Sequence, residues 1–232
     1  MSGKQPETLL GHLPFLKEVP VHTLHSILTG LILSAISIYI FISLKYSEDY
    51  TMPDERPSIK GFFEMVTEFF YNILTGILGE EGGKYVPFVT SIFLFILFSN
   101  LLGLIPGFYP PTMNINTNAG IAAFVFLSYN YFGFRTHGIS YLKQFLGPIP
   151  FLAFLFLPVE MISHIFRPVS LSIRLFGNIF GDHTALETFT SLVPIFVPAL
   201  FMILGLIVSI VQAFVFALLS GIYIALAVSH EH

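Results

Sequence analysis

Apolar residues fill this chain in long runs that are separated by a few short polar connections. The first run covers residues 22–44 and ends at Lys45, so it is as long as the roughly 20 residues that a helix needs to cross a bilayer. It lacks the short apolar region and small-residue cleavage site of a signal peptide, and we therefore expect a retained membrane span. The charged, proline-containing stretch 48–60 that follows is typical of a connection exposed to water.

Residues 58–81 have a different pattern, in which apolar residues recur at helical spacing with charged and amide residues close by. This pattern predicts an amphipathic helix lying along the cytoplasmic surface of the membrane. The apolar residues are Phe62, Phe63, Val66, Phe69, Phe70 and Ile73, and the polar ones are Lys60, Glu64, Glu68 and Asn72.

Residues 85–134 are predicted to form a membrane hairpin, with spans over 85–105 and 116–134 joined by a short turn that contains Pro110 and Pro111. After a polar loop comes the hairpin region 149–229, which consists of two apolar tracts.

The first of these tracts covers residues 149–190 and is broken only by Pro158 and Pro168. It is too long for one upright span, so the helix is tilted, kinked or preceded by a separate short segment. The second tract, 192–228, is also too long to stand upright and contains no charged residue and no histidine. We expect these two tracts to form a tilted helical hairpin.

The whole pattern predicts an all-α, polytopic membrane protein with a single membrane domain, 1–232. Five helices cross the membrane, one amphipathic helix lies on its surface, and the last two helices are long and tilted. Four Lys and Arg residues lie in the connection 45–84 and two in the loop 135–143, which places both in the cytoplasm. Five crossings then place the N-terminus outside and the C-terminus in the cytoplasm.

The composition agrees with a membrane protein, since 54% of the residues are hydrophobic and only 10% are charged. Cysteine is absent, which excludes disulfides and thiolate metal sites. There is no basic tract for nucleic acid and no glycine-rich phosphate loop, so we expect neither nucleic acid nor nucleotide to bind. We expect no cofactor and no metal, and no catalysis by the chain alone.

Arg174 is the most informative residue, because it lies inside an apolar tract without an acid to pair with. The residues one helical turn away are Ser170, Leu171, Gly177 and Asn178, and none is acidic. An arginine in the middle of a membrane costs about 3 kcal/mol on insertion scales. Its counter-charge is therefore expected to come from outside this helix.

At about 100° per residue, several polar residues point within about 40° of Arg174 and form one polar stripe. His183 points the opposite way and shares that face with Glu187, while Asp182 lies beside His183. Two polar surfaces at different depths favour two aqueous half-paths, with the permanent charge of the arginine between them. His183 and Glu187 can relay protons. The other stripe residues are Glu160, Ser163, Arg167, Ser170, Asn178 and Gly181.

A second face is predicted on the last helix, where small and polar residues recur at steps of three or four. Its small residues allow close approach to the preceding helix, and Gln212 offers both donors and acceptors. For Ser209 and Ser220, helix packing and a place on an ion path remain equal alternatives. The face contains Gly205, Ser209, Gln212, Phe216, Ser220 and Tyr223.

The segment 167–178, Arg-Pro-Val-Ser-Leu-Ser-Ile-Arg-Leu-Phe-Gly-Asn, resembles the subunit a family of rotary F-type ATP synthases. The resemblance extends over 212–216 through Tyr223 to the ending 229–232, and more weakly over 100–106. It implies a stator subunit in a bacterial-type inner membrane, with the ring of c subunits, the b-subunit stalk, the remaining F1F0 complex and membrane lipid as partners. The missing counter-charge of Arg174 would be the carboxylate of a rotating c subunit.

The resemblance also implies roles for single residues. Ring-facing positions match Arg174, Ser170, Arg167 and Asn178. The outer half-channel matches Asn178, His183 and Gln212, and the cytoplasmic exit matches Glu160, Ser163 and Arg167.

The sequence departs from the family pattern at Gly205 and Gly103, where relatives carry a titratable or acidic side chain. We hypothesise that Glu187 supplies the carboxylate of the outer path, with Asp182 as the alternative. H⁺ and Na⁺ both remain open as the coupling ion, although His183 and Glu187 favour H⁺.

The sequence also suggests two other functions. An intramembrane metalloenzyme is suggested by the spacing of His183 with Glu187 and of Glu160 with His164, but no metal motif joins the pairs and an arginine would repel the cation. A secondary transporter would hold an anionic substrate on Arg174, but the sequence has no inverted repeat.

Overall fold

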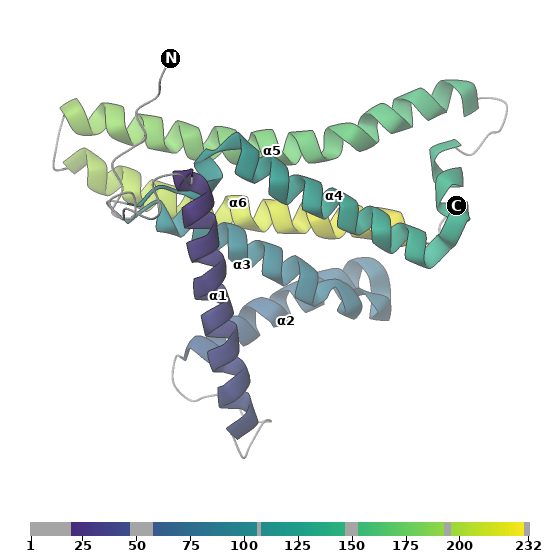
Figure 1. Ribbon diagram of the computed structural model, residues 1–232, viewed down its shortest axis with the longest axis horizontal. Helices are drawn as coiled ribbons and strands as arrows, with labels where there is room; N and C mark the ends of the chain where they lie inside the picture. Colours follow the sequence, from purple (N-terminus) through teal and green to yellow (C-terminus); the bar gives the residue numbers. More distant parts are fainter. Residues whose placement is uncertain (1–19, 47–57, 106–107, 147–152, 193–195, 230–232) are drawn as a thin grey trace. The chain divides into compact units, whose positions relative to one another are not determined.

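The computed structural model describes residues 20–46, 58–105, 108–146, 153–192 and 196–229. Every element in these ranges is helical, which confirms the all-α class (Figure 1). The α-helices are α1 (Val21–Tyr46), α2 (Ile59–Leu78), α3 (Val86–Leu102), α4 (Ile115–His137), α5 (Ala153–Leu192) and α6 (Phe196–Val228). The 3-10 helices are η3 (Gly79–Tyr85), η4 (Pro111–Met113) and η5 (Gly138–Leu146).

The chain divides into two compact units, Met1–Pro111 and Thr112–His232. In the first unit α1 and α2 both pack on α3. Ser58 caps the N-terminus of α2: its hydroxyl accepts a hydrogen bond from the amide of Gly61 at 3.0 Å and so satisfies one of the unpaired donors of the first turn. Its buried side contacts α3 through Phe70, whose ring centroid lies 5.1 Å from that of Phe93.

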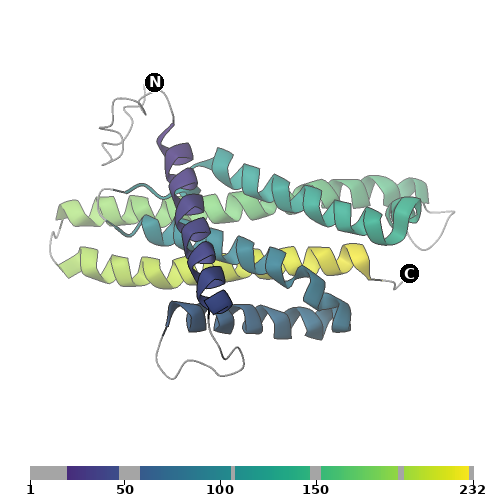
Figure 2. The ribbon, with the colours of Figure 1, turned by 60° about the horizontal axis from the view of Figure 1, so that its bottom comes forward.

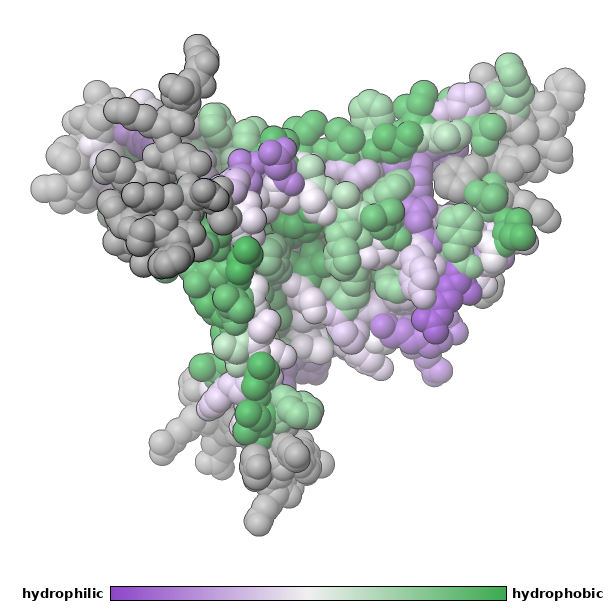
Figure 3. Space-filling model, in the orientation of Figure 1, coloured by the Kyte–Doolittle hydropathy of each residue, from purple (hydrophilic) through white to green (hydrophobic). Residues whose placement is uncertain are grey.

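Large apolar side chains remain exposed along α1, which is expected of a helix surrounded by lipid. Leu31 is 63% exposed, Ile38 59% and Phe41 69%, and Figure 3 shows hydrophobic side chains along this helix and along α5. Three segments of the described residues are long and apolar enough to cross a membrane: Val21–Ser43, Ile59–Leu102 and Pro198–Val228. This supports a polytopic membrane protein.

The number of crossings and the surface position of α2 stay predictions. By length and apolarity, α2 and α3 together form one candidate segment, Ile59–Leu102. Neither α4 nor α5 is among the three candidate segments. The polar connection over 48–57 and the residues 149–152 and 230–232 lie outside the described residues.

In the second unit α4, α5 and α6 pack on one another, and α6 returns antiparallel to α5 (Figures 1 and 2). Close packing is possible because α6 buries small residues: Ser209 is 2% exposed and Ala213 and Ala217 are 0% exposed. The C-terminal ends of α4 and α6 meet where Nε2 of His137 lies 3.1 Å from the carbonyl oxygen of Val228.

Helix α5 is continuous from Ala153 to Leu192, with Pro158 and Pro168 inside it. The separate short segment that the sequence allowed does not form within these residues. Figure 1 shows one bent helix instead, as expected where a proline removes a backbone hydrogen bond.

Candidate functional site

Arg174 lies on α5 with its side chain exposed. Among the residues that the structure describes, no acid lies within ion-pair distance of its guanidinium. Its neighbours on the exposed side are apolar, with Phe166 61% exposed and Ile173 57% exposed. Arg174 is therefore an exposed cation flanked by large apolar side chains.

The polar stripe of α5 runs along the edge between the packed and the exposed sides of this helix. Ser163 and Ser170 are exposed, while Asn178 is partly buried. The packed side is formed by residues such as Leu171 and Leu175, which are 3% and 1% exposed. The stripe thus borders the helices of its own unit and also remains open to a partner.

Two glycines near Arg174 leave the α5 backbone uncovered by side chains on this side. Gly177 and Gly181 are exposed, and a Cβ atom added at either position would meet nothing within 4 Å. Another helix could therefore approach the α5 backbone closely on this side.

Near its N-terminal end, the stripe contains an ion pair. Oε1 of Glu160 lies 3.7 Å from Nη2 of Arg167, and the two side chains are 42% and 24% exposed. The guanidinium carbon of Arg167 also lies 5.4 Å from the ring centroid of Tyr223 on α6, which is a cation–π contact. The structure therefore joins two residues of the predicted α5 stripe, Glu160 and Arg167, to Tyr223 of the predicted α6 face.

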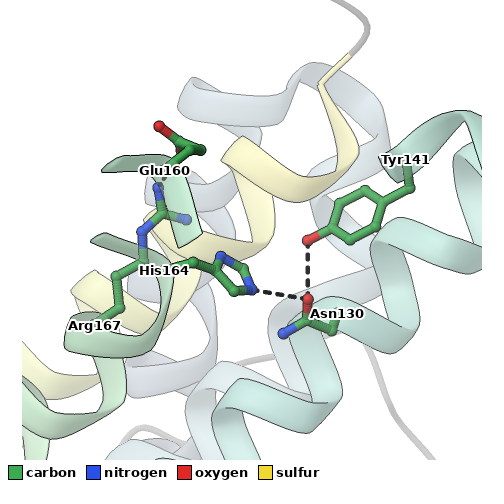
Figure 4. Close-up of polar contacts among 5 residues, drawn as sticks. All are labelled: Asn130, Tyr141, Glu160, His164 and Arg167. Atoms are coloured by element: carbon green, nitrogen blue, oxygen red, sulfur yellow. Dashed lines mark hydrogen bonds and ion pairs between the residues drawn. The ribbon is translucent and has the colours of Figure 1, made fainter. Parts of the chain in front are cut away.

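Beside this pair lies a cluster that sequence reasoning missed, namely Asn130, Tyr141 and His164 (Figure 4). Oδ1 of Asn130 accepts a hydrogen bond from the hydroxyl of Tyr141 at 3.1 Å and lies 3.0 Å from Nε2 of His164. Tyr141 belongs to η5, and its burial raises the pKa of its hydroxyl although the charge of Arg167 lowers it. The hydroxyl therefore stays protonated and donates.

The only signal for this cluster in the sequence is an amide inside an apolar span, because a buried carboxamide must find partners. The sequence places His164 at a metal-like spacing from Glu160, and it is equally compatible with an interfacial or packing residue. In the part of the chain that the structure describes, no three His, Asp or Glu side chains gather as metal ligands do.

Towards the C-terminal end of α5, the three titratable residues differ in burial. Asp182 and His183 are partly buried, whereas Glu187 is exposed. The Oδ2 atom of Asp182 is buried and has no hydrogen-bond partner among the described residues.

The predicted face of α6 is turned inward. Gly205, Ser209, Phe216 and Ser220 are buried, and Gln212 and Tyr223 are partly buried. The hydroxyl of Ser220 donates to the carbonyl of Phe216 at 2.8 Å, as a packing residue would. Within the described ranges no hydrogen bond joins Gln212 to Arg174.

Comparisons with known proteins point to one family. The family model for the ATP synthase A chain matches residues 25–225. The chain is 48% identical over 191 residues to ATP synthase subunit a of Bdellovibrio bacteriovorus, covering 82% of this chain and 83% of that protein. It is 40% identical over 222 residues to ATP synthase subunit a 3 of Pelobacter propionicus, covering 95% of this chain and 97% of that protein. The similarity therefore extends over nearly the whole chain.

Proposed function

Because the chain belongs to the ATP synthase A chain family, we propose that it is the stator subunit of a rotary ATP synthase and passes protons to and from the carboxylates of a rotating c-subunit ring. The observation that carries this proposal is the exposed Arg174 on α5, which has no acid within ion-pair distance in the described part of the chain. A partner that covers this surface must offer both apolar side chains and a negative charge. A membrane-embedded carboxylate on a helix provides both.

Arg174 has two tasks in this mechanism. Its charge favours the ionised form of the rotor carboxylate that passes it, since an opposite charge nearby stabilises a carboxylate. Its charge also repels a proton that would cross directly from one half-path to the other. Each proton must then be carried round by the ring, and each charge crossing supplies about 2.3 kcal/mol per 100 mV of membrane potential.

The outer half-path consists of Asn178, His183 and Gln212, with a carboxylate supplied by Glu187 or Asp182. Glu187 is exposed, whereas Asp182 has a buried oxygen without a hydrogen-bond partner among the described residues. These two positions suit different tasks, since the first exchanges protons with water and the second passes them inward.

The cytoplasmic half-path consists of Glu160, Ser163 and Arg167, with Ser170 between this group and Arg174. The carboxylate of Glu160 is 42% exposed, which lets it exchange protons with water. The long, exposed ion pair with Arg167 is weak, so it does not prevent proton uptake.

The subunit acts within the F1F0 complex in a bacterial plasma membrane. Its partners are the c ring, the b-subunit stalk and lipid, and the chemistry of ATP belongs to other chains. The N-terminus lies outside and the C-terminus in the cytoplasm, as the distribution of Lys and Arg indicates.

The experiment that tests this function is Arg174→Ala in the complete complex, studied in inverted membrane vesicles. We expect ATP-driven proton pumping to be lost and passive proton leak to rise. Arg135→Ala is the matched control, because Arg135 is an exposed arginine at the last turn of α4, and it should pump at the wild-type rate. Unchanged pumping and leak in Arg174→Ala would refute the mechanism.

A further inference from the structure

Asn130 joins three elements at one point of the second unit, and we call Asn130, Tyr141 and His164 the Asn130 junction. Its Oδ1 atom lies 3.1 Å from the hydroxyl of Tyr141 on η5 and 3.0 Å from Nε2 of His164 on α5. Its Nδ2 atom donates to the carbonyl of Phe126 on its own helix at 2.7 Å. Figure 4 shows both other side chains pointing to this oxygen.

These contacts determine the orientation of the Asn130 amide and the tautomer of His164. Exchanging the nitrogen and oxygen of Asn130 would place two acceptors, its Oδ1 and the carbonyl of Phe126, against each other. Because Oδ1 only accepts, Nε2 of His164 carries a hydrogen and donates it. The imidazole ring is thereby fixed in one orientation.

From His164 a series of ring contacts leads to Arg167. The ring of His164 lies 5.4 Å from that of Tyr129, and Tyr129 lies 5.8 Å from Tyr223. Arg167 lies over Tyr223 at 5.4 Å. Tyr129 is 1% exposed, so this packing has little room to adjust when one ring moves.

Arg167 is held more firmly by this aromatic packing than by its acid. Its separation of 3.7 Å from Glu160 exceeds a hydrogen-bond distance, and the acid is 42% exposed. Glu160 can therefore gain or lose a proton while Arg167 keeps its place on Tyr223.

We propose that Asn130 is a positioning residue for the cytoplasmic half-path. It orients His164, the rings of His164, Tyr129 and Tyr223 keep the guanidinium of Arg167 in place, and Glu160 thus meets a stationary cation. This rests on the proposed function, because that function assigns Glu160 and Arg167 to proton exit.

The test measures ATP-driven proton pumping by the complete complex in inverted vesicles, at equal amounts of assembled complex. Asn130→Leu keeps the number and branching of the side-chain heavy atoms but removes the acceptor, and we expect pumping to fall about fivefold. Asn116→Leu is the matched control, since Asn116 is exposed on the same helix, and it should pump at the wild-type rate. His164→Leu should match Asn130→Leu, and His164→Gln, which keeps an N–H donor, should restore most of the rate.

A double-mutant cycle separates positioning from mere packing. Arg167→Lys keeps the charge but loses the planar group that stacks on Tyr223. If Asn130 acts through Arg167, then Asn130→Leu should lower pumping less than about twofold in the Arg167→Lys background. If the losses in pumping caused by Asn130→Leu and Arg167→Lys multiply in the double variant, the proposal is wrong. Wild-type pumping by Asn130→Leu would also overturn it.

If Asn130→Leu reduces the amount of assembled complex, Tyr141→Phe tests the proposal instead, because it removes one hydroxyl and leaves the Asn130 amide in place. We expect Tyr141→Phe to lower proton pumping about twofold. Pumping at the wild-type rate would refute the proposed role of the Asn130 junction. The Arg174→Ala result is read separately. Loss of coupling in Arg174→Ala together with normal pumping by the junction variants would reject only this inference.

Discussion

A leucine in place of Gly177 tests whether a rotor helix packs on the exposed side of α5. Gly177 lies one turn from Arg174 and is exposed, and an added Cβ meets nothing within 4 Å. The chain itself therefore accommodates Gly177→Leu. Because glycine inside a helix is destabilising by roughly 0.5–1 kcal/mol relative to alanine, leucine should leave the helix as stable as before or more stable.

The same leucine that leaves α5 stable should slow the rotation of the c-subunit ring. If c-subunit helices pass close to this backbone, the leucine must be accommodated at each step, and overpacking costs typically about 1–3 kcal/mol. A barrier raised by that amount slows each step about 5-fold to 150-fold. We expect ATP-driven proton pumping to fall within this range while the amount of assembled complex stays at the wild-type level.

The control is Gly120→Leu on α4, where the glycine is also helical and exposed and an added Cβ also meets nothing within 4 Å. It should pump at the wild-type rate. The assay is acidification of inverted vesicles after ATP addition, corrected for the quantity of complex seen on native gels. Equal pumping by Gly177→Leu and Gly120→Leu would show that no moving surface approaches Arg174 on this side.

Substitutions at three further places in the chain test the outer half-path, the packing of the second unit and the start of α2. Asp182→Asn should lower proton pumping more than tenfold and Glu187→Gln only a few-fold if the buried acid passes protons inward, and the reverse order would assign the outer carboxylate to Glu187 alone. Gly133→Ala should destabilise the second unit by about 1–3 kcal/mol, measured as lower thermal stability of the complex, because the new Cβ would lie 2.5 Å from the ring of Tyr141. Ser58→Ala should destabilise α2 by about 1 kcal/mol through loss of its N-cap, and equal protease resistance of the variant would contradict this.

Hydrophobic periodicity was enough to predict the helices, because membrane helices bury their backbone polar groups internally and must be long and apolar. The predicted first span 22–44 lies inside α1, Val21–Tyr46. The amphipathic pattern over 58–81 matches α2, Ile59–Leu78, followed by a 3-10 helix. The helical angle around α5 predicted only that Arg174 and Ser170 share a face, and in the structure both are exposed.

The Asn130 junction could not be predicted in this way, because periodicity carries no information about contacts between helices. Asn130 is 11 residues from Tyr141 and 34 from His164. The continuity of α5 through two prolines was open for a related reason. A proline removes one backbone hydrogen bond, and whether the helix continues depends on the neighbours that compensate.

The two arginines of the α5 stripe show how the same residue type takes different tasks two turns apart. Arg167 has an acid at 3.7 Å and a tyrosine ring at 5.4 Å, both within its own unit. Arg174 has neither among the described residues, although an unpaired arginine in a membrane costs about 3 kcal/mol. An acid on the same helix within reach of Arg174, as Glu160 is for Arg167, would offset part of that cost. It would also hold Arg174 permanently, so a carboxylate arriving from a partner could no longer pair with it. Under the proposed function, the missing acid is what would leave Arg174 available to one moving carboxylate after another.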